Sequence, residues 1–146
     1  MRPTTRPASN APEGAVRTRS ARVWLGEDGI IRIRPHGRQR EELDDAIENV
    51  SAVAKVGQGV KRRLLVDLSE AGPQSTACRE HYMCAESKKN VSAMAIVTGS
   101  LLGRIIGNLI IGTNRTSVPV RLFPSEAAAV LWLEELALPE SGPRSR

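Results

Sequence analysis

Hydrophobic positions along the chain follow two periods, one typical of strands and one typical of helices. Residues 22–25 and 30–35 are rich in Val, Ile, Leu and Trp and flank a glycine-containing turn at 27–29, which predicts a β-hairpin. Isoleucine alternates with arginine from residue 31 to residue 34, so this strand is predicted to have one buried face and one face in water.

The rest of the pattern predicts strands and helices in turn. Short apolar runs predict strands at residues 63–68, 92–98 and 118–123. Pro119 indicates that the last of these strands begins there or lies at a sheet edge. Helical spacing predicts helices from Glu41 to Gly57, over 75–89, over 101–112 and after Ser125, the last with an apolar stripe of Ala128, Leu131, Trp132 and Leu136.

The order of these elements predicts the fold class. Right-handed crossovers make strands that are separated by helices parallel. We therefore expect an α/β domain over residues 22–138, with an N-terminal β-hairpin plus three βα units and a mostly parallel central sheet flanked by helices. Residues 1–21 and 139–146 are rich in Pro, Ser, Thr and Arg, and we expect both to be disordered tails because they bury too little apolar surface.

Charge and composition narrow the class of partner. The net charge of +5 comes from residues 1–22 and 139–146, and residues 23–138 are neutral overall. The 146 residues include one Phe, one Tyr and two Trp, few rings for stacking on bases, so we predict no specific nucleic-acid partner. The apolar runs are too short to cross a membrane. Two cysteines and the lack of an apolar signal segment favour a reducing, cytoplasmic location.

Catalytic and metal-binding patterns are weak. On a helix, Cys78, His81 and Cys84 would spread over about 120° and about 9 Å, a geometry that supplies two zinc ligands but rarely three. The other histidine, His36, lies in a distant predicted loop, and neither histidine accompanies a nucleophile motif. An enzyme that uses Asp67 or His81 is the least favoured hypothesis, and we expect no enzymatic activity, metal or cofactor.

The loop after the strand at 63–68 carries the best candidates for binding. Ser69, Ser75 and Thr76 follow Asp67, at the carboxyl end of a predicted parallel strand, where α/β proteins bind ligands. A phosphate on Ser75 would lie at a helix N-terminus, which favours negative charge. Alternatively, Ser75 is only a helix cap.

The predicted helix over 101–112 has an unusual polar face. Gly103 and Gly107 each cost about 1 kcal/mol relative to alanine in a helix interior. These glycines share a face of the predicted helix with Arg104 and Asn108. That face either contacts a neighbouring element or a binding partner, or is simply exposed to water.

Several segments resemble a known family. Residues 63–69 (RLLVDLS), followed by a helix, resemble the central strand and loop of STAS domains, the family of SpoIIAA-like anti-sigma-factor antagonists. Residues 95–100 (AIVTGS), 119–123 (PVRLF) and 126–133 (EAAAVLWL) resemble an uncharacterised bacterial branch of STAS-like proteins, near lipid-binding Sec14-like folds. The resemblance covers residues 22–138. The family's Asp-Ser-Ser-Gly pattern is replaced here by GPQSTA at 72–77.

The resemblance implies a non-enzymatic regulatory module that binds a protein partner. In the family that partner is a kinase that doubles as an anti-sigma factor and phosphorylates a serine or threonine at the helix start, here Ser75 or Thr76. Candidate residues for partner or ligand binding are Asp67, Ser69, Arg79, Ser100, Arg104 and Asn108. The alternative is a STAS- or Sec14-like module that binds a small ligand or lipid near the third helix, with Arg104 holding an anionic group. The oligomeric state stays open, a dimer included.

Overall fold

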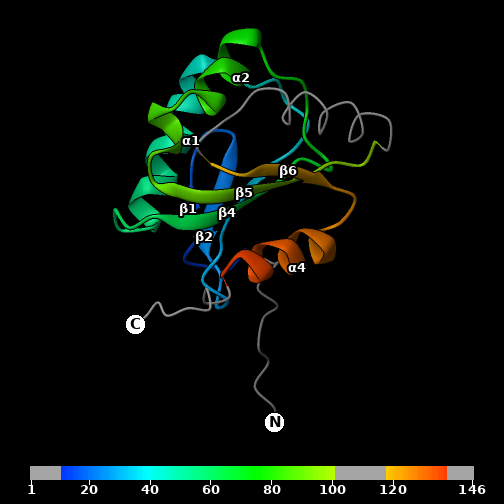
Figure 1. Cartoon of the computed structure of the whole chain (residues 1–146). Coiled ribbons are helices and arrows are strands. Elements are labelled where there is room, and N and C mark those ends of the chain that lie inside the picture. Colours follow the sequence, from blue (N-terminus) through cyan, green and yellow to red (C-terminus); the bar gives the residue numbers. More distant parts are fainter. Residues whose placement is uncertain (1–10, 101–117, 138–146) are drawn as a thin grey trace.

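The structure is a computed structural model that describes residues 11–100 and 118–137 (Figure 1). Within these residues the strands form one sheet, in the order in which they occur along the chain. They are β1 (Val16–Arg17), β2 (Ala21–Leu25), β3 (Ile31–Pro35), β4 (Arg62–Asp67), β5 (Val91–Val97) and β6 (Val120–Phe123). Pairing is antiparallel from β1 to β3 and parallel from β3 to β6. The predicted α/β fold, a hairpin followed by a mostly parallel sheet, is confirmed.

Helices cover both faces of this sheet. They are α1 (Leu43–Val56), α2 (Thr76–Met83) and α4 (Glu126–Ala137), with a short 3-10 helix, η1 (Glu86–Lys88), after α2. Figure 1 shows α1 and α2 on one face and α4 on the other. The helix predicted over 101–112 falls outside the described residues.

Two hydrophobic cores lie on the two faces. Leu64 packs with side chains of α1, whereas the next residue, Leu65, packs with side chains of α4. In β5, Met94 likewise packs in the core beneath α1, and Ala95 packs in the core beneath α4. Successive side chains of a strand point to opposite faces, so a strand between two helical layers is apolar at every position. The predicted burial on both faces is confirmed for β4 and β5, whereas β6, at the edge of the sheet, leaves Arg121 exposed.

The arginine face of β3 differs from the prediction. Arg32 is only 3% exposed, although the alternating pattern predicts it to be in water. Its guanidinium donates two bonds of 2.9 Å to Asp28 and one of 3.1 Å to Glu126. Because Glu126 begins α4, the helix that covers this face also supplies one of the carboxylates that neutralise the buried cation.

The helix predicted over 75–89 is shorter than expected. Ser75 caps it as predicted, but α2 ends at Met83 and the backbone of Cys84 is extended. The polar residues that follow have no apolar face to hold a longer helix against the sheet, and they form η1 instead.

The predicted apolar stripe of α4 is right for two of its four residues. Ala128 and Trp132 pack against the core, but Leu131 is 66% exposed and Leu136 is 46% exposed, and the residues that the structure buries are Ala129 and Leu133. Nine of the twelve residues of α4 are apolar, so the sequence pattern does not distinguish the face that packs on the sheet.

The folded domain starts earlier than residue 22. Val16–Arg17 forms β1, and both Thr18 and Ser20 are buried. The composition of this segment predicts a tail because it lacks large apolar side chains. The segment is held instead by polar contacts with α1, among them the bond between Arg19 and Asp45.

Candidate functional site

An apolar pocket of about 220 Å³ lies between the sheet and helices α1 and α2. The strands contribute Ile33, Leu64 and Ile96 to its wall, and α1 contributes Val50 and Val53. A water molecule takes up about 30 Å³ of liquid, so the space equals roughly seven waters. Apolar walls hold such water poorly, and a small apolar molecule fits the space better.

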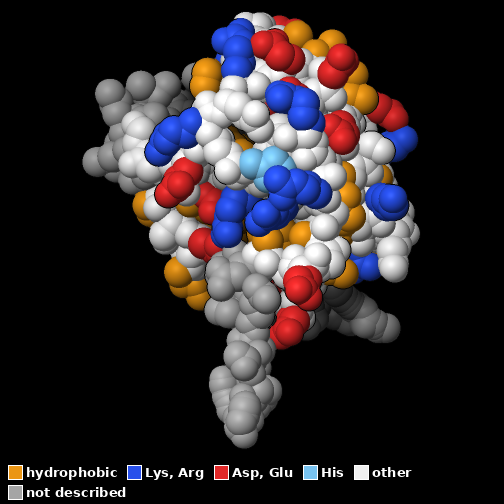
Figure 2. Space-filling model, turned by 180° about the vertical axis from the view of Figure 1, so that it is seen from behind, with side chains coloured by type: hydrophobic (Ala, Val, Ile, Leu, Met, Phe, Trp, Pro, Cys, Tyr) orange, Lys and Arg blue, Asp and Glu red, His pale blue; other side chains and the backbone are white. Residues whose placement is uncertain are grey.

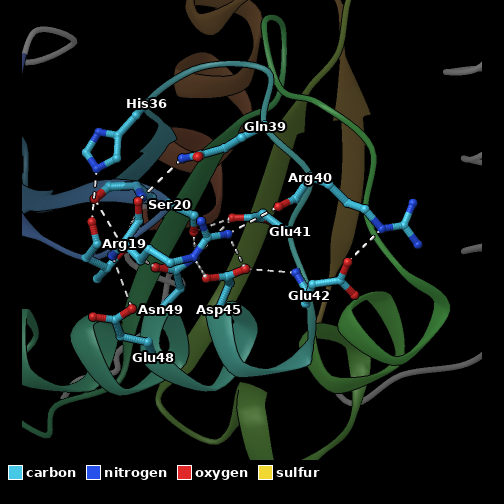
Figure 3. Close-up of polar contacts among 12 residues, drawn as sticks. Arg19, Ser20, His36, Gln39, Arg40, Glu41, Glu42, Asp45, Glu48 and Asn49 are labelled. Carbon is cyan, nitrogen blue, oxygen red and sulfur yellow. Dashed lines mark hydrogen bonds and ion pairs between the residues drawn. The ribbon is translucent and has the colours of Figure 1, made fainter.

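One end of this pocket is polar and centred on Glu41, which is 6% exposed. Ser20 Oγ donates to Glu41 Oε2 at 2.6 Å, and Gln74 Nε2 donates to Oε1 at 3.0 Å. The Tyr82 hydroxyl donates to Oε1 at 3.3 Å, and Asn49 Nδ2 donates to Oε2 at 3.2 Å. A buried carboxylate is tolerated when its oxygens accept several hydrogen bonds, as they do here. Figure 3 shows Ser20, Glu41 and Asn49 converging in this network.

Asn49 and Tyr82 complete the network. Asn49 is fully buried on α1, its side-chain oxygen accepts a bond of 2.5 Å from Thr18 Oγ1, and its amide nitrogen donates to the Tyr82 hydroxyl at 2.8 Å. Burial raises the pKa of Tyr82 far above its usual value, so the phenol keeps its proton at neutral pH. The polar end is therefore a fixed set of donors and acceptors.

The start of α1 is held by a second polar cluster beside this network (Figure 3). The Arg19 guanidinium binds both carboxylate oxygens of Asp45, at 2.5 and 2.7 Å. Asp45 also accepts the backbone N–H of Glu42 at 2.8 Å, which closes the capping box of the helix. The hydrogen bond from Arg19 lowers the pKa of Asp45. This cluster fixes the chain on either side of Glu41 and so positions the polar end of the pocket.

Ser75, Thr76 and Arg79 lie together at the start of α2. Ser75 Oγ accepts the backbone N–H of Cys78 at 3.1 Å, which confirms the predicted cap. Arg79 also lines the pocket, and its guanidinium donates to the carbonyl of Gln74 at 2.8 Å and to Thr76 Oγ1 at 3.4 Å. Thr76 is exposed. The structure thus brings three of the predicted site residues to one edge of the pocket.

Two other predicted residues lie on the opposite face of the sheet. Asp67 Oδ1 accepts both the backbone N–H of Ser69, at 3.1 Å, and its hydroxyl, at 2.6 Å. The other oxygen of Asp67 accepts a bond of 3.2 Å from Arg34, on the side that α4 covers. Asp67 and Ser69 therefore stabilise the end of β4, and they do not line the pocket.

Of the remaining candidates, Ser100 is exposed beyond the end of β5. Arg104 and Asn108 lie outside the described residues, so the predicted role of their helix is neither supported nor contradicted.

Four residues of the polar end were not predicted from the sequence: Ser20, Glu41, Asn49 and Tyr82. One signal was available, because Asn49 lies three residues after Ala46 and four before Val53, a spacing that puts it on the same helix face as these apolar residues. A polar residue on such a stripe is normally hydrogen-bonded in the core. Nothing local indicates its partners, which come from three separate segments.

The two cysteines lie in contrasting environments. Cys78 is fully buried, and burial raises the pKa of its thiol to about 11. Cys84 is exposed, and a contact of 3.3 Å with the Ser87 hydroxyl lowers the pKa of its thiol. In residues 11–100 and 118–137 no three His, Cys, Asp or Glu side chains are grouped as metal ligands would be. No helix in the same residues is long and apolar enough to cross a membrane.

Comparisons with known proteins support the fold. Residues 23–137 match the family model of a domain of unknown function, DUF7793. The crystal structure of an uncharacterised DUF3478-family protein from Shewanella loihica PV-4, described as having a SpoIIAA-like fold, matches with a TM-score of 0.58 and 15% identity, over 78% of this chain and 92% of that one. The predicted resemblance to SpoIIAA-like domains is thereby confirmed at the level of the fold.

A protein of unknown function from Arthrobacter sp. FB24 is 24% identical over 83% of this chain and 98% of that one, with a TM-score of 0.32. No curated protein matches the chain.

Proposed function

This chain belongs to the DUF7793 family, and we propose that it is a non-enzymatic binding module that holds a small amphipathic molecule in the pocket beneath α1 and α2. The observation that carries this proposal is the pocket itself, about 220 Å³ with apolar walls and a single polar end. Filling such walls with ligand removes apolar surface from water, which contributes about 25 cal/mol per Å². Fixed polar groups at one end then orient the ligand.

Arg79 is the residue that we propose to hold the polar head of the ligand. It lines the pocket, and two of its donor groups are used by Gln74 and Thr76. A guanidinium has five N–H donors, so others are left for a carboxylate or similar group. Arg79 therefore takes the role predicted from the sequence for Arg104.

A non-catalytic role is supported by how the ionisable groups of the pocket are used. Both oxygens of Glu41 already accept hydrogen bonds, and Tyr82 keeps its proton. Neither His36 nor His81 lines the pocket. A general base needs an acceptor within reach of a substrate proton, and Glu41 has none to spare.

The test uses straight-chain carboxylates of increasing length, titrated into the full chain by calorimetry. Val50→Trp fills the pocket from α1 and should abolish binding. Ile47→Trp places the same ring on the exposed side of the same helix, where Ile47 is 47% exposed, and should bind as the native protein does. The proposal is wrong if the native protein binds none of the acids, or if Val50→Trp binds them unchanged.

A second candidate function is a protein interaction through residues 69–79 that phosphorylation controls. The observation that favours it is the position of Thr76, exposed in the first turn of α2 with the Arg79 guanidinium beside its hydroxyl. A phosphate there would gain both the helix N-terminus and a charge-assisted bond. The Ser75 hydroxyl already caps the helix, so Thr76 is the better acceptor of the two. Following the STAS resemblance, the partner is a cytoplasmic kinase or anti-sigma factor.

Intact-mass measurement of the chain from its native cells tests this candidate. Native protein should carry the mass of one phosphate, Ser75→Ala should keep it, and Thr76→Ala should lose it. Capture experiments with Thr76→Asp and Thr76→Ala should then recover different partners. Unmodified protein under all growth conditions would rule the switch out.

A further inference from the structure

Three arginines lie in register across the first three strands. Arg17 is directly opposite Arg22 in the β1–β2 pair, and Arg22 is directly opposite Arg34 in the β2–β3 pair. Side chains that oppose one another in this way share one face, with Cβ atoms about 5 Å apart. Neighbouring strands are about 4.8 Å apart, so the row is about 10 Å long.

This row lines a hollow on the surface. The hollow has a volume of about 310 Å³, and His36, Pro35 and Ala11 complete its wall. Figure 2 shows Lys and Arg side chains gathered around a histidine on the side of the molecule turned away from the view of Figure 1. On the same face of the sheet, α4 packs on β4, β5 and β6, beyond the row.

The positive charge of the hollow is only partly balanced. Arg34 lies 3.2 Å from an oxygen of Asp67 and 3.6 Å from one of Glu126, and its guanidinium lies over the ring of Trp24. Within the part of the chain that the structure describes, no carboxylate lies within ion-pairing distance of Arg17 or Arg22. Like charges directly opposite each other destabilise a sheet, and an anion between them would remove that repulsion.

His36 is oriented at the edge of this hollow. Its Nε2 lies 3.0 Å from the carbonyl oxygen of Thr18. A carbonyl oxygen only accepts, so Nε2 carries the hydrogen of this bond and fixes the ring at the edge of the hollow.

We propose that this hollow binds a compact polyanion with two or more linked phosphoryl groups, a di- or triphosphate. The planar fork of each guanidinium matches a pair of phosphate oxygens. A row about 10 Å long suits several linked phosphoryl groups better than a single carboxylate. Arg34 already lies beside Asp67 and Glu126, and one carboxylate would neutralise either Arg17 or Arg22 and leave the other. This site is on the opposite face of the sheet from the apolar pocket, so it stands or falls independently of the proposed function.

The test is a calorimetric titration of the full chain with inorganic pyrophosphate and tripolyphosphate at physiological salt. Arg22→Gln removes the middle arginine of the row and should weaken phosphate binding by about tenfold or more, because the free energy of one charge-assisted hydrogen bond corresponds to about a tenfold change in affinity. Arg17→Gln should also weaken it. Arg121→Gln is the matched control, because Arg121 is an exposed arginine on β6, at the other edge of the sheet. The affinity of Arg121→Gln for pyrophosphate and tripolyphosphate should stay within about twofold of that of the native protein. Thermal unfolding checks that each variant is folded.

Three results would overturn the proposal. The first is that the native protein binds neither pyrophosphate nor tripolyphosphate at millimolar concentration. The second is that Arg121→Gln weakens binding as much as Arg22→Gln does. The third is that both Arg17→Gln and Arg22→Gln bind as the native protein does.

A second experiment identifies the source of the phosphoryl groups. Co-sedimentation with phosphatidylcholine vesicles that contain phosphatidylinositol bisphosphate, released by pyrophosphate, indicates a lipid headgroup. Binding of pyrophosphate without vesicle binding indicates a free metabolite, and both outcomes support the site.

Discussion

Replacing Arg32 by methionine would remove a guanidinium that is 3% exposed while keeping much of the apolar stem. The native group donates two bonds of 2.9 Å to Asp28, one of 3.1 Å to Glu126 and one of 3.3 Å to the carbonyl of Ile30. In Arg32→Met both carboxylates stay in place, Asp28 without the guanidinium that binds it and Glu126 with only Arg34, 3.6 Å away. The variant therefore measures what a buried arginine contributes where the sequence pattern predicts an exposed one.

The expected loss can be bounded from the burial of the partners. Removing one member of a buried ion pair costs about 3–5 kcal/mol, because the other member is left uncompensated. The side chains of Asp28 and Glu126 are 21% and 22% exposed, so they regain some water when Arg32 is lost. We therefore expect the lower end, about 3 kcal/mol of unfolding free energy. For a domain of this size that lowers Tm by roughly 10 °C.

Urea unfolding followed by circular dichroism measures this loss, with an unchanged m value as the check that the unfolded states are comparable. The control is Arg40→Met, which removes the 2.7 Å ion pair between Arg40 and Glu42, where both side chains are 57% exposed. Such a surface pair contributes less than about 1 kcal/mol. If the two variants lose the same unfolding free energy, the reasoning from burial is refuted.

Two further measurements separate this explanation from a simple packing defect. Adding Asp28→Asn to Arg32→Met removes one orphan charge and should recover part of the loss. Burial is the largest single influence on the pKa of Asp28 and raises it, but the hydrogen bonds from Arg32 and from the backbone, together with the charge of Arg32, lower the pKa overall. The stabilisation is thus present above the ordinary aspartate pKa, near 3.9, and is lost as pH falls through the lowered folded value. The difference between native protein and Arg32→Met should shrink as the pH falls below about 4.

Three other predictions concern the start of α1, the cysteines and a close backbone contact. Asp45→Ala removes the capping box of α1 and should lower the unfolding free energy by about 1 kcal/mol at pH 7. Because the folded pKa of Asp45 is lowered, the difference between native protein and variant in urea unfolding should disappear only in acid, below the ordinary aspartate pKa. Exposed Cys84, with its lowered pKa, should react with iodoacetamide well before buried Cys78, whose pKa is about 11, and peptide mass analysis that finds Cys78 modified first would contradict this. Gly72→Ala should cost about 1–3 kcal/mol in urea unfolding, because the new Cβ would meet the backbone carbonyl of Arg38, and an unchanged midpoint would show that the loop moves freely.

Much of the fold could be predicted because its signals are local. The strands and helices depend on the spacing of apolar residues a few positions apart, and the cap by Ser75 depends on a residue three positions away. The errors arise where a distant segment decides. Arg32 is buried because Glu126, 94 residues later, comes to lie against it.

The candidate site divides in the same way. The start of α2, with Ser75, Thr76 and Arg79, could be chosen from the sequence as a candidate site, because the loop after a parallel strand is a common place for one. The polar end of the pocket could not, because the Tyr82 hydroxyl and Glu41 are 41 residues apart and meet only when α2 packs beside α1.

The row of Arg17, Arg22 and Arg34 shows what each level decides. The sequence by itself determined the alternation of strands and helices, the parallel order of the sheet and the excess of arginine near the N-terminus, because these depend on neighbouring residues and on composition. Whether those arginines form a site depends on strand register, since a slip of one residue would turn Arg22 to the face that α1 covers. Register is set by the packing of Val23 and Ile33 into the core beneath α1, and only the tertiary structure contains that contact.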